Sequence, residues 1–154
     1  MANYTTADIK KLREETGAGM LDCKKCLDEA DGNYDQAKKL ALAKGLAKAD
    51  KKADRETKEG YIASYVHQTN KVAAMVEILC ETDFVAKNSD FQEMAKNVAM
   101  HITAMNPDNV EELLAQSFVR DPEITIEELV KRTSGKIGEK FVVNRFIRYE
   151  VGQQ

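Results

Sequence analysis

The spacing of apolar positions changes along the chain and divides it into two regions. Up to about residue 46, apolar residues recur every three or four positions, which predicts short helices. Turn-forming residues separate these helices at Gly17–Gly19 and at Asp31–Asn33. We therefore expect residues 1–46 to form three helices that pack as a small bundle with a thin core.

Local signals mark the ends and the inner faces of these helices. Thr5 and Asp8 have the spacing of a capping box, in which each side chain binds the backbone of the other. Glycine at position 17 favours the left-handed conformation that closes a helix. The apolar side of the second helix is predicted from positions about one turn apart: Met20, Cys23 or Lys24, and Leu27.

The next stretch, residues 47–59, is rich in Lys, Ala and Asp and has no apolar stripe. It predicts a solvated basic connector that is partly helical. The longer span 38–58 holds eight basic and three acidic residues, which is typical of a solvated charged face. No aromatic residues are interleaved there for base stacking, so we expect no direct contact with nucleic acid.

Residues 60–154 show a different pattern. Positions 72–80 alternate with period two, and a polar turn at 68–70 separates them from a similar run, which predicts a hairpin. Residues 91–105 return to helical spacing, with Asn88 or Ser89 as a cap, and shorter helical pieces follow at 110–115 and 126–133. The last strand is predicted as one alternation: Phe141, Val143, Ile147, Tyr149 and Val151.

The predicted fold class is therefore α+β: a three-helix N-terminal module, then a small three-stranded antiparallel sheet packed with helices. The predicted domains are residues 1–46, the connector 47–59 and a core of residues 60–154. A sheet of three strands leaves an edge or a bare face that must be covered.

Composition narrows the function classes. The net charge of −3 over 154 residues argues against a dominant surface for nucleic acid or membranes, because neutralising phosphates needs a basic excess. No apolar run approaches the ~20 residues of a membrane span. The first residues contain no signal peptide, and three cysteines form no disulfide framework, so we expect a cytoplasmic protein.

Candidate catalytic chemistry is sparse. Cys23 and Cys26 have CxxC spacing, which is compatible with a redox pair or half of a zinc site. A zinc site needs four ligands, and Cys80, His67 and His101 would have to converge from elsewhere. We interpret the pair as ordinary helix cysteines, and we expect no enzyme activity, metal or cofactor.

One segment resists a purely structural interpretation. The stretch "CETDFVAKN" places the aromatic Phe84 in an acidic connection between a strand and a helix, where small polar residues are usual. The ring either folds back onto the sheet or enters a pocket of another protein. The residues alone favour the ring that folds back onto the sheet.

Longer motifs carry a resemblance over nearly the whole chain. "TGAGMLDCKK", "VEILCETDFVAKN" and "FVVNRFIRYEVG" are similar to the elongation factor Ts family. The resemblance implies an N-terminal module of the ubiquitin-associated type and an exchange of guanine nucleotide on elongation factor Tu. It implies that one segment enters the partner's G domain, displaces magnesium and promotes GDP release: Thr82, Asp83, Phe84 and Val85.

The resemblance also implies docking of the N-terminal module on GDP-bound and nucleotide-free elongation factor Tu. Many family members carry two copies of the half-core, whereas this chain resembles the short form with one. We therefore expect a homodimer through the strand that ends at Val151. An alternative is a protein-binding adaptor without exchange activity. The candidate docking residues are Leu12, Gly17, Ala18, Gly19 and Met20.

Overall fold

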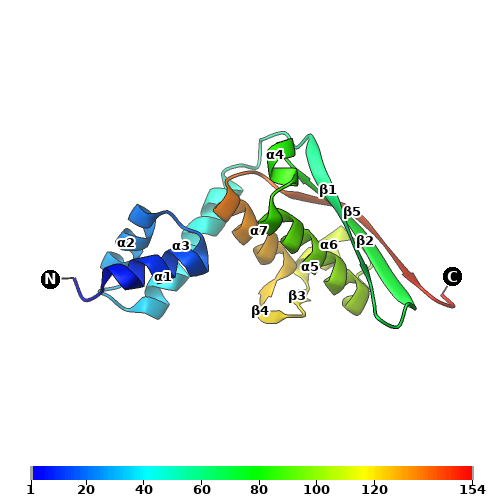
Figure 1. The fold of residues 1–154 in the computed structure, drawn as a ribbon, viewed down its shortest axis with the longest axis horizontal. Coiled ribbons are helices and arrows are strands. Elements are labelled where there is room, and N and C mark those ends of the chain that lie inside the picture. The colour runs from blue at the N-terminus through cyan, green and yellow to red at the C-terminus, as the bar shows by residue number, and fades with distance from the viewer. Residues whose placement is uncertain (1, 154) are drawn as a thin grey trace.

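The chain folds into three N-terminal helices placed beside a sheet that further helices cover on one face (Figure 1). The computed structural model describes residues 2–153, and for residues 48–50 the backbone alone. One hydrophobic cluster lies among the N-terminal helices and another between the sheet and its helices. The expected α+β class is confirmed.

The N-terminal helices are α1 (Thr6–Thr16), α2 (Met20–Glu29) and α3 (Tyr34–Asp50). The predicted capping box is present, because the Thr5 N–H donates to the Asp8 carboxylate at 2.7 Å and the Asp8 N–H to the Thr5 hydroxyl at 3.3 Å. Gly17 closes α1 with a φ of 70°. The capping box and the closing glycine could both be predicted because each depends on residues within one helical turn.

The core of these helices consists of small and medium side chains. In α2, Cys23 and Leu27 are buried as predicted, but Met20 is 45% exposed. Helical side chains tilt towards the N-terminus, so the side chain of the first residue of α2 points beyond the bundle. The buried apolar residues are Leu12, Cys23, Cys26, Leu27, Ala30, Ala37 and Ala41.

Most described side chains of the predicted connector 47–59 are exposed, and one is buried. α3 extends through its first residues to Asp50, and Lys52 is buried. The Lys52 ammonium donates to the carbonyl of Ser134 in α7 (Ile126–Ile137) at 3.1 Å. A buried amine needs such a partner, and nothing in the local sequence identifies one 82 residues away.

The sheet contains β1 (Glu59–Val66), β2 (Val72–Cys80) and β5 (Val142–Glu150), in the order β1-β2-β5 with antiparallel neighbours. The predicted hairpin is confirmed. α5 (Ser89–Met105) packs across one face, capped by Asn88. Its predicted stripe is buried except for Met105 at the last helical position, which is 46% exposed.

The alternation predicted for the last strand is wrong beyond Val143. A β-bulge interrupts the pairing, so that Ile78 lies opposite Val143 but Glu77 lies opposite Arg145. The extra residue, Asn144, reverses which side chains face the helices. Ile147, Tyr149 and Val151 are consequently exposed at 43%, 69% and 70%, rather than sharing the inner side with buried Val143.

A small second sheet was not predicted. β3 (Ser117–Phe118) follows α6 (Val110–Ala115) and pairs with β4 (Asp121–Thr125). Phe118 and Ile124 place their side chains in the main core, so the sheet closes one side of it. Strands of two and five residues are too short for a period to be recognised.

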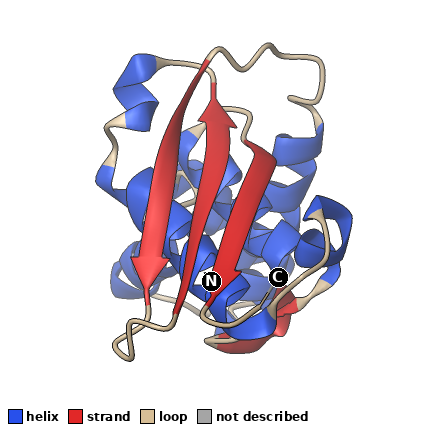
Figure 2. Cartoon of the chain, turned by 90° about the vertical axis from the view of Figure 1, so that its right-hand side faces the viewer, coloured by secondary structure: helices blue, strands red, loops and turns tan. Residues whose placement is uncertain are grey.

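The face of the three-stranded sheet opposite the helices is bare, as Figure 2 shows. Paired residues form cross-strand rows on this outer face: Val66–Ala73–Tyr149, Ser64–Met75–Ile147 and Ile62–Glu77–Arg145. Apolar side chains dominate the rows, and Glu77 and Arg145 form an ion pair at 3.3 Å. None of the helices within residues 2–153 has the length and apolar character needed to cross a bilayer.

Candidate partner-binding surface

The segment that carries Phe84 forms a single helical turn, α4 (Asp83–Ala86), between β2 and α5. Thr82 caps it, because the Thr82 hydroxyl accepts the N–H of Val85 at 3.3 Å. A helix of one turn is not stable by itself in water, since forming the first turn costs more than its single bond returns. Contacts with the rest of the protein must therefore hold α4 in place.

Phe84 and Val85, which are neighbours in this turn, differ sharply in exposure. Phe84 is 84% exposed, whereas Val85 is only 6% exposed and belongs to the main core. The inward packing that the residues alone favour for Phe84 does not occur in this structure. Val85 instead anchors the turn, and the exposed ring is held out in water by its neighbour.

The charged residues of the turn remain at the surface. The Lys87 ammonium lies 3.0 Å from the Asp83 carboxylate, with both side chains mostly exposed. Pairs of this kind contribute little to stability because water screens them. Asp83 also lies in the first turn of α4, where a negative charge interacts favourably with the helix N-terminus.

The start of α4 is tied to the turn between α7 and β5 by two glutamates. One oxygen of the Glu139 carboxylate accepts the N–H groups of Glu81 and Thr82, each at 3.0 Å. The other oxygen accepts the Thr82 hydroxyl proton at 2.6 Å. In return, the Glu81 carboxylate accepts the N–H of Lys140 at 2.8 Å. We call these four residues the α4 clamp.

Further bonds join the clamp to the connector and to β2. Arg55 lies 3.4 Å from the Glu81 carboxylate and donates to the carbonyl of Gly138 at 3.3 Å. The Cys80 thiol donates to the Thr82 carbonyl at 3.3 Å, and burial raises the pKa of that thiol to about 11, so it keeps its proton at neutral pH. The peptide and side-chain polar groups of Thr82 are thus all engaged.

Sequence reasoning found Thr82, Asp83, Phe84 and Val85 but missed Glu139. The structure brings Glu139 to this segment from 57 residues away, next to the end of α7. Nothing in the local pattern around Glu139 distinguishes it from a surface glutamate.

The candidate docking residues of the N-terminal module occupy different environments. Leu12 is fully buried in the module's core, and Met20 is exposed, next to Leu21, which is 74% exposed. Gly17 lies against α7, because a Cβ at this position would come within 2.3 Å of the Lys136 side chain. Met20 and Leu21 are therefore the side chains here that are open to a partner, and Leu12 holds the module together.

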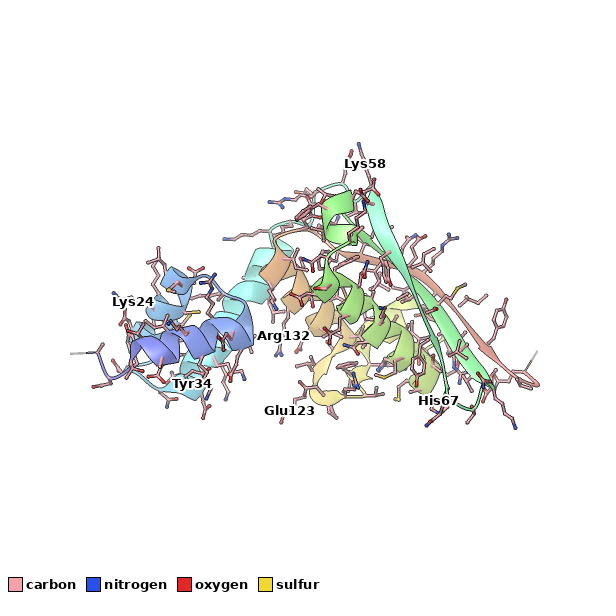
Figure 3. The ribbon with its side chains drawn as sticks, viewed as in Figure 1. Lys24, Tyr34, Lys58, His67, Glu123 and Arg132 are labelled. Carbon is pink, nitrogen blue, oxygen red and sulfur yellow. The ribbon has the colours of Figure 1, made fainter. Side chains whose placement is uncertain are left out.

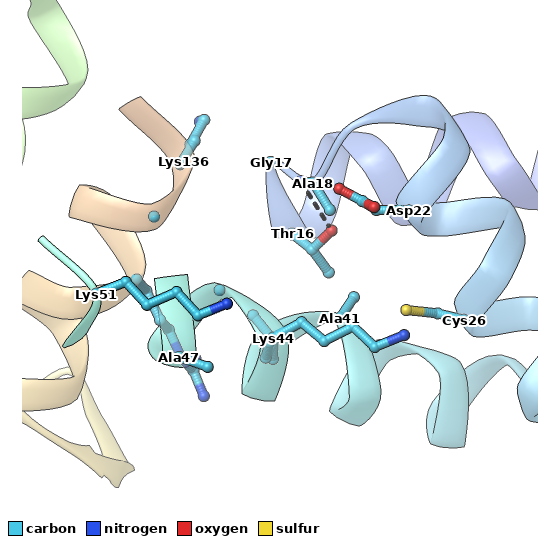
Figure 4. A pocket seen from close by; sticks show the side chains of 14 residues that line it. Thr16, Gly17, Ala18, Asp22, Cys26, Ala41, Lys44, Ala47, Lys51 and Lys136 are labelled. Atoms are coloured by element: carbon cyan, nitrogen blue, oxygen red, sulfur yellow. Dashed lines mark hydrogen bonds between the residues drawn. The ribbon is translucent and has the colours of Figure 1, made fainter. Parts of the chain in front are cut away.

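The module and the core meet along a cleft of about 200 Å³ between α2, α3 and α7 (Figure 4). At its base α3 and α7 pack at backbone distance, since a Cβ on Gly135 would lie 2.8 Å from the carbonyl oxygen of Gly45. Arg132 lines the cleft from α7, and its buried Nε has no hydrogen-bond partner within residues 2–153. The contact between the module and the core therefore leaves a buried polar group without a hydrogen bond, unlike the α4 clamp.

The CxxC cysteines are buried in the module. Cys23 and Cys26 are free thiols, and burial raises the pKa of both, so they are poor nucleophiles at neutral pH. Within residues 2–153, no group of three or more His, Cys, Asp or Glu side chains is arranged to hold a metal ion.

The two histidines lie away from α4. Figure 3 shows His67 at the end of the sheet opposite Lys58, and α4 lies at the Lys58 end. His101 is buried in α5, where its Nδ1 accepts the N–H of Val119 at 3.3 Å and its Nε2 lies 2.9 Å from the Gln116 side-chain oxygen. Burial lowers the pKa of His101, so this residue is a neutral packing group.

The fold and the site together define a class: a small α+β protein whose prominent exposed features are apolar contact surfaces, namely Phe84 and the outer face of the sheet. The family model "Elongation factor TS" matches residues 46–113 and 81–154. The chain belongs to the elongation factor Ts family.

Curated relatives support the same family. "Elongation factor Ts" of Aquifex aeolicus (strain VF5) is 47% identical over 148 residues, which cover 93% of this chain and 51% of the relative. The relative of the same name from Fervidobacterium nodosum is 39% identical, covering 94% of this chain and 96% of the relative. That from Oleidesulfovibrio alaskensis is 40% identical, covering 99% and 100%.

Length distinguishes these relatives. The chain spans about half of the Aquifex aeolicus protein but almost all of the other two. The alignment with the Oleidesulfovibrio alaskensis relative extends over 197 positions, more than the 154 residues of this chain. That relative therefore contains inserted residues that this chain lacks.

Proposed function

We propose that this protein is a guanine nucleotide exchange factor for elongation factor Tu, which promotes GDP release by displacing magnesium. Membership of the elongation factor Ts family supports a role in translation elongation. The observation that carries the finer proposal is Phe84, 84% exposed on a turn whose backbone is held by the core. An exposed ring with a fixed backbone suits insertion into an apolar slot of a partner.

The energetics require more than this one ring. A nucleotide bound with nanomolar affinity has a binding free energy of about 12 kcal/mol. An exchange factor loosens it only by binding the nucleotide-free state more tightly, and the coupling is reciprocal. Burying Phe84 contributes roughly 1.5–3 kcal/mol, so the remainder must come from further contacts, for which Met20 and Leu21 are the exposed candidates.

On this proposal the protein acts by binding alone, without covalent chemistry or a cofactor of its own. Magnesium and GDP belong to the partner, whose phosphates and metal ion hold each other in place. The exchange factor competes with the contacts that the partner makes to the phosphates and the metal ion. We propose the cytoplasm as its location, because translation elongation takes place there.

The test is the release of a fluorescent GDP analogue from elongation factor Tu, with wild-type protein, with Phe84→Ala and with Val119→Ala as a control. Val119 is an exposed apolar residue between β3 and β4, and these strands lie away from α4 (Figure 1). We expect fast release with wild type and Val119→Ala, and loss of most acceleration with Phe84→Ala. Binding without any acceleration by the wild type would instead favour an adaptor of the ubiquitin-associated type.

We further propose that the chain forms a homodimer through the outer face of its sheet, which includes β5. The face is broad and apolar, and exposed patches of this kind in soluble proteins mark interaction sites. It also carries the Glu77–Arg145 pair, whose opposite charges can meet their counterparts across a two-fold axis. A second copy therefore fits both the apolar rows and the charges, and a monomeric mass in light scattering at micromolar concentration would overturn this.

A further inference from the structure

We infer that Glu139 is a positioning residue for Phe84: its carboxylate fixes the start of α4 and thereby the direction of the exposed ring. The part of the inference that concerns nucleotide exchange rests on the function proposed above. Its structural part, that Glu139 holds the backbone of α4, stands independently of any partner.

The first argument is the number of bonds that one side chain makes. The Glu139 carboxylate accepts three hydrogen bonds from two consecutive residues, at 3.0, 3.0 and 2.6 Å. Bonds to an ionised acceptor are stronger than those between neutral groups. No other side chain in the described part of the chain binds both Glu81 and Thr82 in this way.

The second argument is the direction of the Thr82 hydroxyl. The hydroxyl donates a hydrogen bond to the Glu139 carboxylate, with 2.6 Å between the two oxygens. This orientation turns a lone pair of the hydroxyl oxygen towards the Val85 N–H, whose nitrogen lies 3.3 Å away. The helix cap of α4 is therefore oriented by Glu139 acting through Thr82. Without the carboxylate, the hydroxyl is free to rotate and the cap loses its fixed geometry.

The third argument is what α4 lacks. It has four residues, too few to propagate a helix, and its own ion pair between Asp83 and Lys87 is largely exposed. Val85 and Ala86 anchor one side of the turn in the core. This burial fixes the depth of the turn, and the clamp fixes its beginning, so both are needed to set the direction of Phe84.

A fixed direction matters because ordering a loop on binding reduces affinity. If α4 is already in its bound form, insertion of Phe84 costs less conformational entropy than insertion from a mobile loop. Loss of Glu139 should therefore weaken the effect of Phe84 without removing the ring itself.

The first experiment measures amide hydrogen exchange in the full chain for wild type, Glu139→Ala, Glu139→Gln and Glu123→Ala. Glu123 is an exposed glutamate on β4, far from α4 (Figure 3), and serves as the matched control. We expect Glu139→Ala to speed exchange of the amides of residues 81–86 about tenfold. Glu139→Gln, which keeps one oxygen acceptor, should restore much of the protection, and unchanged protection in Glu139→Ala would overturn the inference.

The second experiment measures catalysed GDP release from elongation factor Tu for wild type, Phe84→Ala, Glu139→Ala and the double variant. We expect Glu139→Ala to slow release about tenfold and to add nothing once Phe84 is gone, because the two residues act as a unit. A merely structural role would instead give additive losses. Additive losses, or unchanged release in Glu139→Ala, would overturn the functional part.

The two experiments separate this inference from the proposed function. If wild type does not accelerate release, the proposed function fails, and hydrogen exchange alone decides whether Glu139 holds α4. If the wild type accelerates GDP release and the amide hydrogen-exchange protection of α4 is unchanged in Glu139→Ala, the proposed function stands and the positioning role fails.

Discussion

Phe84 and the outer face of the sheet both leave apolar side chains in water, but they differ in shape and support. Phe84 is a single ring on a one-turn helix that the α4 clamp and buried Val85 hold. The outer face is an extended array of paired rows from three strands, including Met75, Ile147 and Tyr149. The first feature is one protruding side chain, and the second is a sheet face that no helix of the described residues covers (Figure 2).

This difference bears on what each can bind. A protruding ring needs a partner with a pocket, whereas an extended apolar face can be covered by another extended face such as its own copy. The polar groups of Thr82, two residues before Phe84, are engaged in intramolecular bonds, so insertion of the ring does not leave these groups desolvated and unpaired. A substitution at Phe84 should therefore leave dimer formation unchanged, and a substitution on the outer face should leave the contact made by Phe84 unchanged.

The largest expected effect contrasts Phe84 with Phe91, seven residues later in the chain. Phe91 is fully buried, with its ring edge-on to Phe141 at 4.7 Å between centroids. We expect Phe91→Ala to lower the free energy of unfolding by about 3–5 kcal/mol. Phe84→Ala should stay within about 0.5 kcal/mol of wild type. Chemical denaturation of both variants tests this, and a large loss in Phe84→Ala would contradict its role as an external contact.

The next effect separates the two surfaces by oligomeric state. Glutamates in place of Met75 and Ile147, which lie opposite one another on β2 and β5, put charge in the middle of the outer face. We expect this double variant to have the mass of a single chain in light scattering while Phe84→Ala keeps the dimer mass. A double variant that remains dimeric would assign the dimer contact to another part of the molecule.

The two surfaces also differ in how far the sequence reveals them. The α+β class, the hairpin, the capping box and the cap of α5 follow from signals within a few residues, and these predictions are confirmed. The alternation of β5 failed because the Asn144 bulge is a property of the pairing with β2. The apolar character of the outer face near Tyr149 could not be recognised before that bulge was known.

The same reasoning applies to the candidate site. Phe84 drew attention because an aromatic residue stands where polar residues are usual, and the resemblance of the flanking motifs gave it a role. Glu139 and Lys52 could not be found, because each acts on a backbone group more than 50 residues away in the sequence. Met20 and Leu12 were both candidate docking residues, and only the packing shows that one is exposed and the other buried.

A smaller effect concerns pH and the core that supports α4. His101 is held neutral, since its Nδ1 accepts the Val119 N–H and burial lowers its pKa below the ordinary value of 6.5. The unfolded chain therefore binds more protons than the folded chain just below pH 6.5, and stability is lost as the pH falls through this range.

Denaturation midpoints between pH 7 and pH 5 measure this loss. A His101→Gln variant has no titrating ring at this position, so its stability should change less over the same interval. An equal pH dependence in wild type and His101→Gln would show that other groups, such as paired carboxylates, account for the loss.

The smallest expected effect tests what holds Phe84 in place. Lys87→Ala removes the ion pair with Asp83. The side chains of Lys87 and Asp83 are 75% and 66% exposed, and exposed pairs with this spacing contribute about 0.3–0.5 kcal/mol to stability. Because the clamp and Val85 remain, we expect hydrogen exchange of residues 81–86 to change little, in contrast to Glu139→Ala. Loosening in Lys87→Ala as large as in Glu139→Ala would mean that α4 is held by its surface pair, and the contrast between a clamped ring and an open face would then lose its structural basis.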